Sequence, residues 1–209
     1  MGHVEMATVQ TRLRVDRWDA EQTDWAHKRL ELPGHVSISR AAFERLRVRP
    51  YSTTVDENCN LVVQAGWVAL LGGVAGTTMS PKFSATNARI GAGTSSTAAS
   101  FSQTTLVGDT GSSSTTSFFK LCSGAPVITT SSAPVTLVFA ASFGSAQANF
   151  AWNEFGTDAG TADSVSNATT GGTFFNRGVS AQGTKASGQT WTATETLQFG
   201  FPSAFGTVS

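Results

Sequence analysis

The feature that most constrains the fold is a period-two alternation of apolar and small polar residues in the C-terminal two thirds of the chain. Residues 135–143 alternate in this way, and residues 190–199 place Trp191, Ala193, Leu197 and Phe199 on one face with threonine and glutamine on the other. Successive side chains of a β-strand point to opposite faces, so this pattern predicts strands with one buried face. Further candidate strands cover 88–92, 117–122, 150–153 and 173–180.

Clusters of glycine, serine and threonine separate these segments, as in 108–116 and 167–172. Such clusters are typical of turns, and six or more short strands joined by turns are typical of a sandwich. The sequence therefore predicts an all-β fold, an antiparallel β-sandwich of jelly-roll-like type.

One short helix is expected ahead of the strands. Asn60 is a suitable cap, and the apolar residues that follow recur at helical spacing on one face: Val63, Trp67, Leu70, Leu71 and Val74. Gly72-Gly73 is expected to end the helix. The apolar stretch is too short and too rich in glycine for a membrane span, so no membrane partner is expected. Ser39 could cap a further turn or two of helix.

Charge is distributed very unevenly along the chain. Nine of the 14 basic and nine of the 14 acidic residues lie within residues 1–60, together with all three histidines. This break predicts an extended, charged N-terminal arm over 1–57 and a helix-plus-sandwich domain over 58–209. The arm is expected to order on its own domain or on a neighbouring subunit, with a small subdomain in the same chain as the alternative. Its deletion is expected to leave a folded sandwich.

The sequence holds few of the patterns that catalysis or cofactor binding requires. The formal net charge is zero, which argues against a nucleic-acid partner because such a partner selects a basic face. There is no nucleophile elbow, no phosphate-binding loop and no metal-ligand spacing of His and Cys. We therefore expect no enzyme activity, no cofactor and no metal. Cys59 and Cys122 could form a disulfide, although two buried thiols are the simpler expectation.

Two carboxylates fall on otherwise apolar strand faces. Glu154 follows Phe150 and Trp152, and Glu195 lies between Trp191 and Leu197. A glycosidase would use such a pair as acid and base if both faced one cleft about 5–10 Å apart. The alternative, which we favour, is that each glutamate is structural and either lies near a strand end or is paired with a basic residue such as Arg89, Arg177 or Lys185.

The aromatic residues favour subunit contacts over a sugar-binding surface. The chain has 14 Phe and five Trp but one Tyr, the residue that usually supplies contact area with a polar group. Large apolar side chains also lie in the charged segment and at the C-terminus. We expect these as interface candidates: Trp18, Trp25, Leu30, Leu32, Phe43, Phe201 and Phe205.

Several short motifs resemble virion structural proteins of tailed bacteriophages. They are Asn60-Leu-Val-Val-x-Ala-Gly, Ala88-Arg-Ile-Gly-Ala-Gly-Thr-Ser-Ser-Thr-Ala-Ala, Gln103-Thr-Thr-Leu, Ala148-Asn-Phe-Ala-Trp-Asn-Glu-Phe-Gly, Phe175-Asn-Arg and Gly183-Thr-Lys-x-x-Gly-x-Thr-Trp. The Asn-Phe-x-x-x-Glu-x-Gly part also resembles attachment domains of tail-collar fibre proteins. The resemblance covers roughly residues 60–199 and implies a location in the virion, a role in particle structure and no catalytic residues. It also implies that Glu154 and Arg177 are structural motif positions.

The expected function is a capsid-surface decoration or cement protein. We expect it to form a homo-oligomer, such as a homotrimer, and to contact the major capsid protein or neck and tail proteins. Two alternatives stay open, a neck or tail appendage that anchors a tail fibre and a receptor- or glycan-binding module. The last predicts aromatic side chains at loop tips.

Overall fold

The computed structural model describes residues 8–57, 60–76, 83–112, 115–130, 134–167 and 173–200. In chain order the elements are β1 (Thr8–Trp18), α1 (Ala20–Leu30), α2 (Arg40–Arg45), β2 (Ser52–Glu57), β3 (Asn60–Val62), α3 (Gln64–Val74), β4 (Ala88–Gly93), β5 (Ser117–Leu121), β6 (Val127–Thr129), β7 (Val135–Phe143), β8 (Ala151–Ala159), β9 (Thr173–Thr184) and β10 (Thr190–Gly200).

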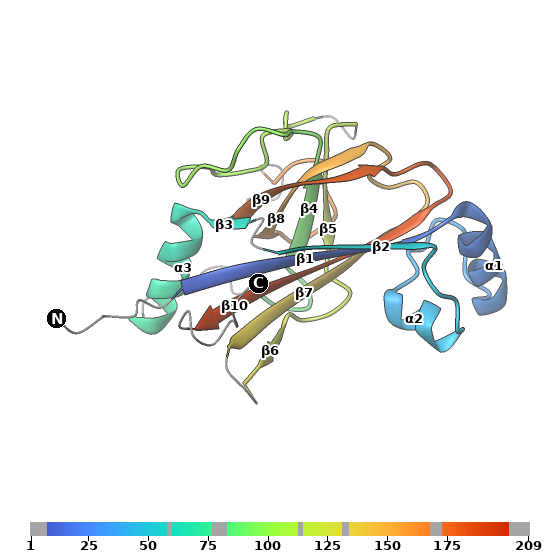
Figure 1. The fold of residues 1–209 in the computed structure, drawn as a ribbon, viewed down its shortest axis with the longest axis horizontal. Coiled ribbons are helices and arrows are strands. Elements are labelled where there is room, and N and C mark those ends of the chain that lie inside the picture. Colours follow the sequence, from blue (N-terminus) through green and yellow to red (C-terminus); the bar gives the residue numbers. More distant parts are fainter. Residues whose placement is uncertain are drawn as a thin grey trace, which may run out of the picture.

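The strands form two five-stranded antiparallel sheets, which confirms the predicted all-β sandwich (Figure 1). The first sheet has the order β2-β1-β10-β7-β6, and the second has the order β3-β9-β8-β4-β5. Strands β1 and β10 pair along eleven positions, from Thr8 opposite Gly200 to Trp18 opposite Thr190. The long strands therefore lie at the centre of each sheet and the short ones at the edges.

The main core lies between the two sheets and follows the predicted alternation. Phe139, Ala141 and Phe143 of β7 are buried, and so are Trp191, Ala193 and Leu197 of β10. From the other sheet, Trp152 packs edge-on against Phe143 and Trp191. Edge-to-face aromatic pairs of this kind stabilise beyond the area that they bury.

The charged N-terminal segment supplies two strands of the sandwich, so it is not the extended arm that was expected, although that expectation allowed it to order on its own domain. Leu13 and Val15 of β1 are buried in the main core, whereas Arg12 and Arg14 face outward. Strand β2 extends the same sheet on the other side of β1. Deleting residues 1–57 would remove both strands and leave one side of β10 unpaired. We therefore withdraw the expectation that the remainder would fold.

The described residues hold three helices, where one main helix was expected. Helix α1 begins with a capping box in which Asp19 accepts a hydrogen bond from Gln22 N (2.8 Å) and Gln22 accepts one from Asp19 N (3.2 Å). Ser39 caps α2, as predicted, by accepting from Ala42 N (3.2 Å). The predicted helix is α3, but it begins after Val63 and continues past Gly72-Gly73, while Asn60 belongs to β3.

Helices α1 and α2 enclose a second, smaller core at one end of the first sheet. Trp18 stacks on Phe43 with ring centroids 4.2 Å apart, and both side chains are buried with Ala26 and Ile38. Leu30 and Leu32 are partly buried against the same cluster. Trp18 and Phe43 thus pack within their own chain, which corrects their assignment as subunit contacts.

Candidate functional site

Glu154 is a buried carboxylate whose oxygens are fully occupied by neighbouring donors. Arg177 Nε on β9 donates to it at 2.7 Å, and both side chains are inaccessible to solvent. Backbone N–H groups of the loop after β4 donate as well, from Ser95 (3.2 Å), Val107 (2.9 Å) and Gly108 (2.6 Å). This set of partners holds a long loop against the sheet and leaves no lone pair for a substrate.

Arg177 holds the same loop from a second direction. Its guanidinium donates to the backbone oxygen of Thr97 (2.8 Å) and to Gln103 Oε1 (3.2 Å). Glycine is required beside this pair, because a Cβ at Gly108 would lie 2.8 Å from Glu154 Oε1. The expected pairing of Glu154 with a basic residue is confirmed.

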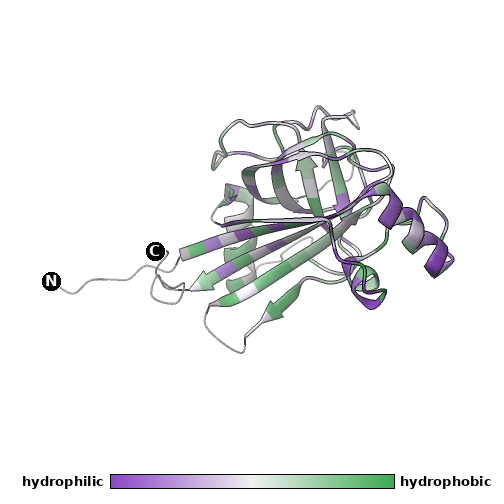
Figure 2. Cartoon of the chain, turned by 45° about the vertical axis from the view of Figure 1, so that its right-hand side comes forward, coloured by the Kyte–Doolittle hydropathy of each residue, from purple (hydrophilic) through white to green (hydrophobic). Residues whose placement is uncertain are grey.

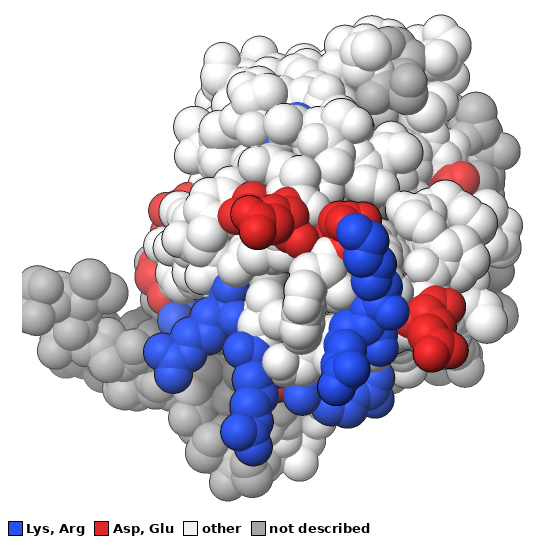
Figure 3. Space-filling view, turned by 90° about the vertical axis from the view of Figure 1, so that its right-hand side faces the viewer, with Lys and Arg blue, Asp and Glu red and all other residues white. Residues whose placement is uncertain are grey.

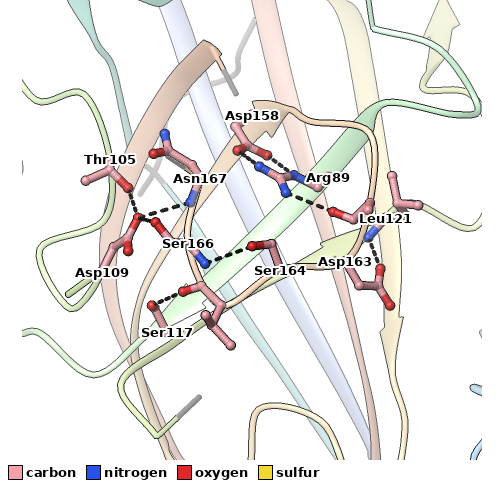
Figure 4. A network of polar contacts seen from close by, with 12 residues as sticks. Arg89, Thr105, Asp109, Ser117, Leu121, Asp158, Asp163, Ser164, Ser166 and Asn167 are labelled. Carbon is pink, nitrogen blue, oxygen red and sulfur yellow. Dashed lines mark hydrogen bonds and ion pairs between the residues drawn. The ribbon is translucent and has the colours of Figure 1, made fainter. Parts of the chain in front are cut away.

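A second buried ion pair lies on the neighbouring strands. Arg89 of β4 contacts Asp158 of β8 through both carboxylate oxygens, and Arg89 Nη1 donates to the Ala162 backbone oxygen (2.9 Å) (Figure 4). Burial raises the pKa of Asp158 to about 6, and the hydrogen bond from Arg89 opposes that rise. A Cβ at Gly160 would overlap the Arg89 guanidinium, so this position also needs glycine.

Asp109 and Asp163 tie the outer loops of the second sheet together. Asp109 Oδ2 accepts from Thr105 Oγ1 (2.6 Å) and from Ser166 Oγ (3.0 Å), and Asp163 Oδ1 accepts from Leu121 N (2.9 Å) (Figure 4). Each carboxylate joins parts of the chain that are far apart in sequence. These side chains therefore stabilise the loops in one arrangement.

Glu195 is buried between the two sheets, and within the described residues its side-chain partners are asparagines and not one of the basic residues expected. It projects from β10 toward the second sheet, where it accepts hydrogen bonds from Asn176 on β9 and Asn60 on β3. Desolvation raises the pKa of Glu195 to about 8, against the hydrogen bond from Asn176. Within the described residues its Oε2 has no hydrogen-bond partner, so a proton on that oxygen removes a buried charge.

The acid–base hypothesis for Glu154 and Glu195 is contradicted. The two carboxylates belong to different sheets, and both are buried with protein partners rather than facing one cleft. In the part of the chain that the structure describes, no group of three or more His, Cys, Asp or Glu side chains is arranged to hold a metal ion. Cys122 is a buried free thiol whose pKa is raised to about 12 by burial, and Cys59 lies outside the described residues.

One end of the molecule carries an exposed apolar helix, α3 (Figure 1). Its inner face is held by Gly66, whose α-carbon comes so close to the backbone of Phe175 on β9 that a Cβ would overlap it. Its outer residues are Val68 (65% exposed), Leu71 (62%) and Val74 (87%). The expected helix is thus confirmed, but most of its apolar stripe faces outward. No helix among the described residues has the length and apolar character needed to cross a membrane.

The opposite end, formed by α1, α2 and their connections, is hydrophilic and carries a cluster of basic side chains together with acidic ones. Figure 2 shows α1 as largely hydrophilic, in contrast to the hydrophobic β6 and β7, and Figure 3 shows Lys and Arg side chains gathered on this face. A groove of about 590 Å³ opens there, lined by Glu21, Gln22, Trp25, Leu46, Arg47, Val48 and Arg49.

Of the interface candidates, Trp25 is the one that the structure places on an open surface, with 47% of its area exposed. Phe201 and Phe205 lie outside the described residues, so their role stays a prediction. The exposed face of α3 and the arginines of the basic groove were not among the candidates. Both surfaces come from short segments with a distinctive composition. Residues 58–76 are uncharged, and residues 45–49 alternate Arg with apolar residues.

Comparison with known proteins adds no relative: no family model, curated protein or solved structure matches this chain. The fold and surfaces define an antiparallel β-sandwich whose loops are anchored by buried ion pairs between strands, with an exposed apolar helix at one end and a cluster of basic side chains at the other.

Proposed function

We propose that this chain is a non-enzymatic structural subunit of a tailed-phage particle, most simply a homo-oligomeric decoration protein on the capsid surface. The observation that carries the proposal is the outer face of α3. A soluble protein rarely exposes a contiguous apolar surface unless that surface binds something.

A second copy of the chain is the partner that we assign to α3. The helix has no charged residue, and its small residues Ala69, Gly72 and Gly73 allow close approach of another backbone. In a closed homo-oligomer the same face of every subunit lies against its neighbours around the symmetry axis, which buries such a face. Three copies are the expected number.

Strand β6 supports assembly from a second place. It is an edge strand, and Val127 and Ile128 are both exposed. Monomeric proteins usually protect such an edge with charge or proline, because unpaired strand edges bind other chains. The apolar exposed edge is therefore consistent with a contact that forms in the particle.

The buried charges fit a structural role better than a catalytic one. Two buried ion pairs, Glu154 with Arg177 and Arg89 with Asp158, form their hydrogen bonds within each pair and with loops of the same chain. The phage assignment itself rests on the resemblance of residues 60–199. A neck or tail appendage that anchors a fibre fits the same surfaces and is the alternative position on the particle.

A receptor- or glycan-binding module remains the second candidate function. It is favoured by Phe101, which is exposed in the Ser/Thr-rich loop between β4 and β5. That candidate predicts glycan binding that is lost in Phe101→Ala, measured on a glycan array.

The test of the particle role is the protein composition of purified particles from the source that encodes this chain. Quantitative mass spectrometry should find the chain in a fixed ratio to the major capsid or tail proteins, and immunogold labelling should place it on the capsid surface. Absence from intact particles would overturn the proposal. Labelling restricted to the tail would support the fibre-anchoring alternative.

A further inference from the structure

The segment beside the groove at the end formed by α1 and α2 carries three arginines that the packing of the fold does not require. Arg45, Arg47 and Arg49 alternate with Leu46 and Val48, which pack against the small core beneath α1 and α2. The alternation directs the three arginine side chains to the surface, where all three are exposed. Within the described residues, the ion pairs of the two helices are Lys28 with Asp24 and Arg40 with both Glu44 and Asp16, and Arg45, Arg47 and Arg49 form none.

Arg47 occupies a backbone conformation that is unfavourable for its residue type. Its φ of 59° lies in the left-handed region, at the position just after α2 where glycine is the usual residue. An arginine is less favourable here than glycine. Glu31 adopts the same conformation at the end of α1, so the conformation alone does not mark a binding residue.

Hydrogen bonds within the chain fix the backbone that lines the groove in the absence of a partner. Gln22 Nε2 on α1 donates to the Arg49 backbone oxygen (3.0 Å), and Trp18 Nε1 donates to the Val48 backbone oxygen (3.2 Å). Tyr51 N donates to the Arg17 backbone oxygen on β1 (2.9 Å). A rigid binding surface loses less conformational entropy when it binds, so these bonds favour recognition.

The side chains around the groove are those that dominate protein–protein contacts. Trp25 lines it with nearly half of its surface exposed, and Tyr51, two residues after Arg49, is also exposed. Tryptophan, tyrosine and arginine are enriched among interface residues that carry most of the binding energy. The guanidinium groups can each hold a carboxylate through two parallel hydrogen bonds.

We propose that this groove binds an acidic segment of a partner protein, with carboxylates on Arg47 and Arg49 and an apolar side chain over Trp25. A nucleic acid fits less well, because Glu21 lines the groove and other acidic side chains flank the basic cluster (Figure 3). Nucleic-acid binding requires a continuous basic surface. The proposal goes beyond assembly through α3, because the groove is lined by residues of α1 and of the segment after α2, and these helices lie at the end opposite α3 (Figure 1).

The test uses labelled poly-L-glutamate as the probe and oligothymidylate of equal charge as the comparison, with the full chain at low ionic strength. Fluorescence anisotropy should show that poly-L-glutamate binds more tightly than oligothymidylate. Arg49→Ala and Trp25→Ala should each weaken that binding by about tenfold, consistent with loss of one charge-assisted contact or one central aromatic contact. Arg12→Ala is the matched control, since it removes an exposed arginine from β1 whose partner is Glu57.

Arg47→Gly separates binding from folding. Glycine relieves the left-handed backbone, so this variant should be at least as stable as the natural chain while its affinity for poly-L-glutamate falls. A loss of stability in Arg47→Gly, equal weakening in Arg12→Ala, or tighter groove-dependent binding of oligothymidylate would each overturn the proposal. Light scattering on the same samples should show an unchanged oligomer mass, so failure here is distinguishable from failure of assembly through α3.

Discussion

Arg177 on β9 and Glu154 on β8 form a 2.7 Å ion pair that is completely buried, and together they hold both sides of the loop between β4 and β5. A charged pair without solvent contact depends on both partners. Taking one away leaves the other charged and unpaired in a low-dielectric environment.

Arg177→Met should therefore lower the free energy of unfolding by about 3–5 kcal/mol. It should also loosen the loop, because Thr97 and Gln103 lose their donor. Urea denaturation gives the first quantity, and limited proteolysis within residues 94–108 gives the second. Arg45→Met, at an exposed position, is the control and should change stability by less than about 0.5 kcal/mol. Equal stability of the two variants would refute the structural assignment of the pair.

The buried carboxyl group of Glu195 should make the free energy of unfolding depend on pH. Its pKa in the folded chain is about 8, whereas its ordinary value is 4.5. Between these values the folded chain keeps a proton that the unfolded chain releases, so stability falls as pH rises through this window. The slope from this one group is at most about 1.4 kcal/mol per pH unit.

Glu195→Gln isolates this contribution, because glutamine matches the protonated carboxyl in shape and cannot ionise. The stability of the natural chain relative to the variant should decline from pH 4.5 to pH 8 and stay constant above it. Chemical denaturation of both proteins across this range measures the difference. A difference that is independent of pH would show that Glu195 is ionised in the folded chain.

A substitution at Gly66 tests whether α3 packs tightly against β9. A methyl group at this position overlaps the Phe175 backbone oxygen, so Gly66→Ala should destabilise the chain by about 1–3 kcal/mol. Helix propensity alone predicts the opposite sign, a gain of about 1 kcal/mol. Gly34→Ala is the matched control, because its methyl group would meet no atom within 4 Å. Thermal unfolding of both variants decides between the two signs, and a stabilised Gly66→Ala would mean that α3 does not pack on β9 as described.

The strands were predictable where apolar and small polar residues alternate without interruption. Trp191, Ala193 and Leu197 were assigned to the inner face of β10 and are buried there. Strand β1 was missed because Arg12, Arg14, Asp16 and Arg17 obscure its alternation of Leu13 and Val15. Two of these charges are themselves buried: Asp16 accepts hydrogen bonds from Thr53 and Arg14, and Arg17 donates to Gln182. The charged segment can lie inside a sheet because other strands supply these partners, and the sequence alone does not show which strands lie beside it.

The surfaces that we propose bind partners were harder to predict than the fold. The apolar spacing of α3 indicated a helix, but an almost wholly apolar helix does not reveal which side is buried. The deciding residue is Gly66, which has no side chain to enter into a hydrophobic pattern. The groove at the other end brings Trp25 next to Arg47 and Arg49, residues that are more than twenty positions apart. Their proximity follows from how α1 and α2 pack on Trp18 and Phe43, which no local pattern encodes.

The central claim is that the outer face of α3 joins copies of this chain. The most direct measurement is the mass in solution by size-exclusion chromatography with light scattering, for the natural chain and for Leu71→Glu combined with Val74→Glu. The natural chain should have the mass of an oligomer, three copies of 21.8 kDa being expected, and the variant should have the mass of one. Thr161→Glu combined with Ser187→Glu adds the same charge at exposed loop positions and should leave the oligomer intact. A natural chain that is monomeric at micromolar concentration, or a double α3 variant that keeps the oligomer mass, would contradict the account.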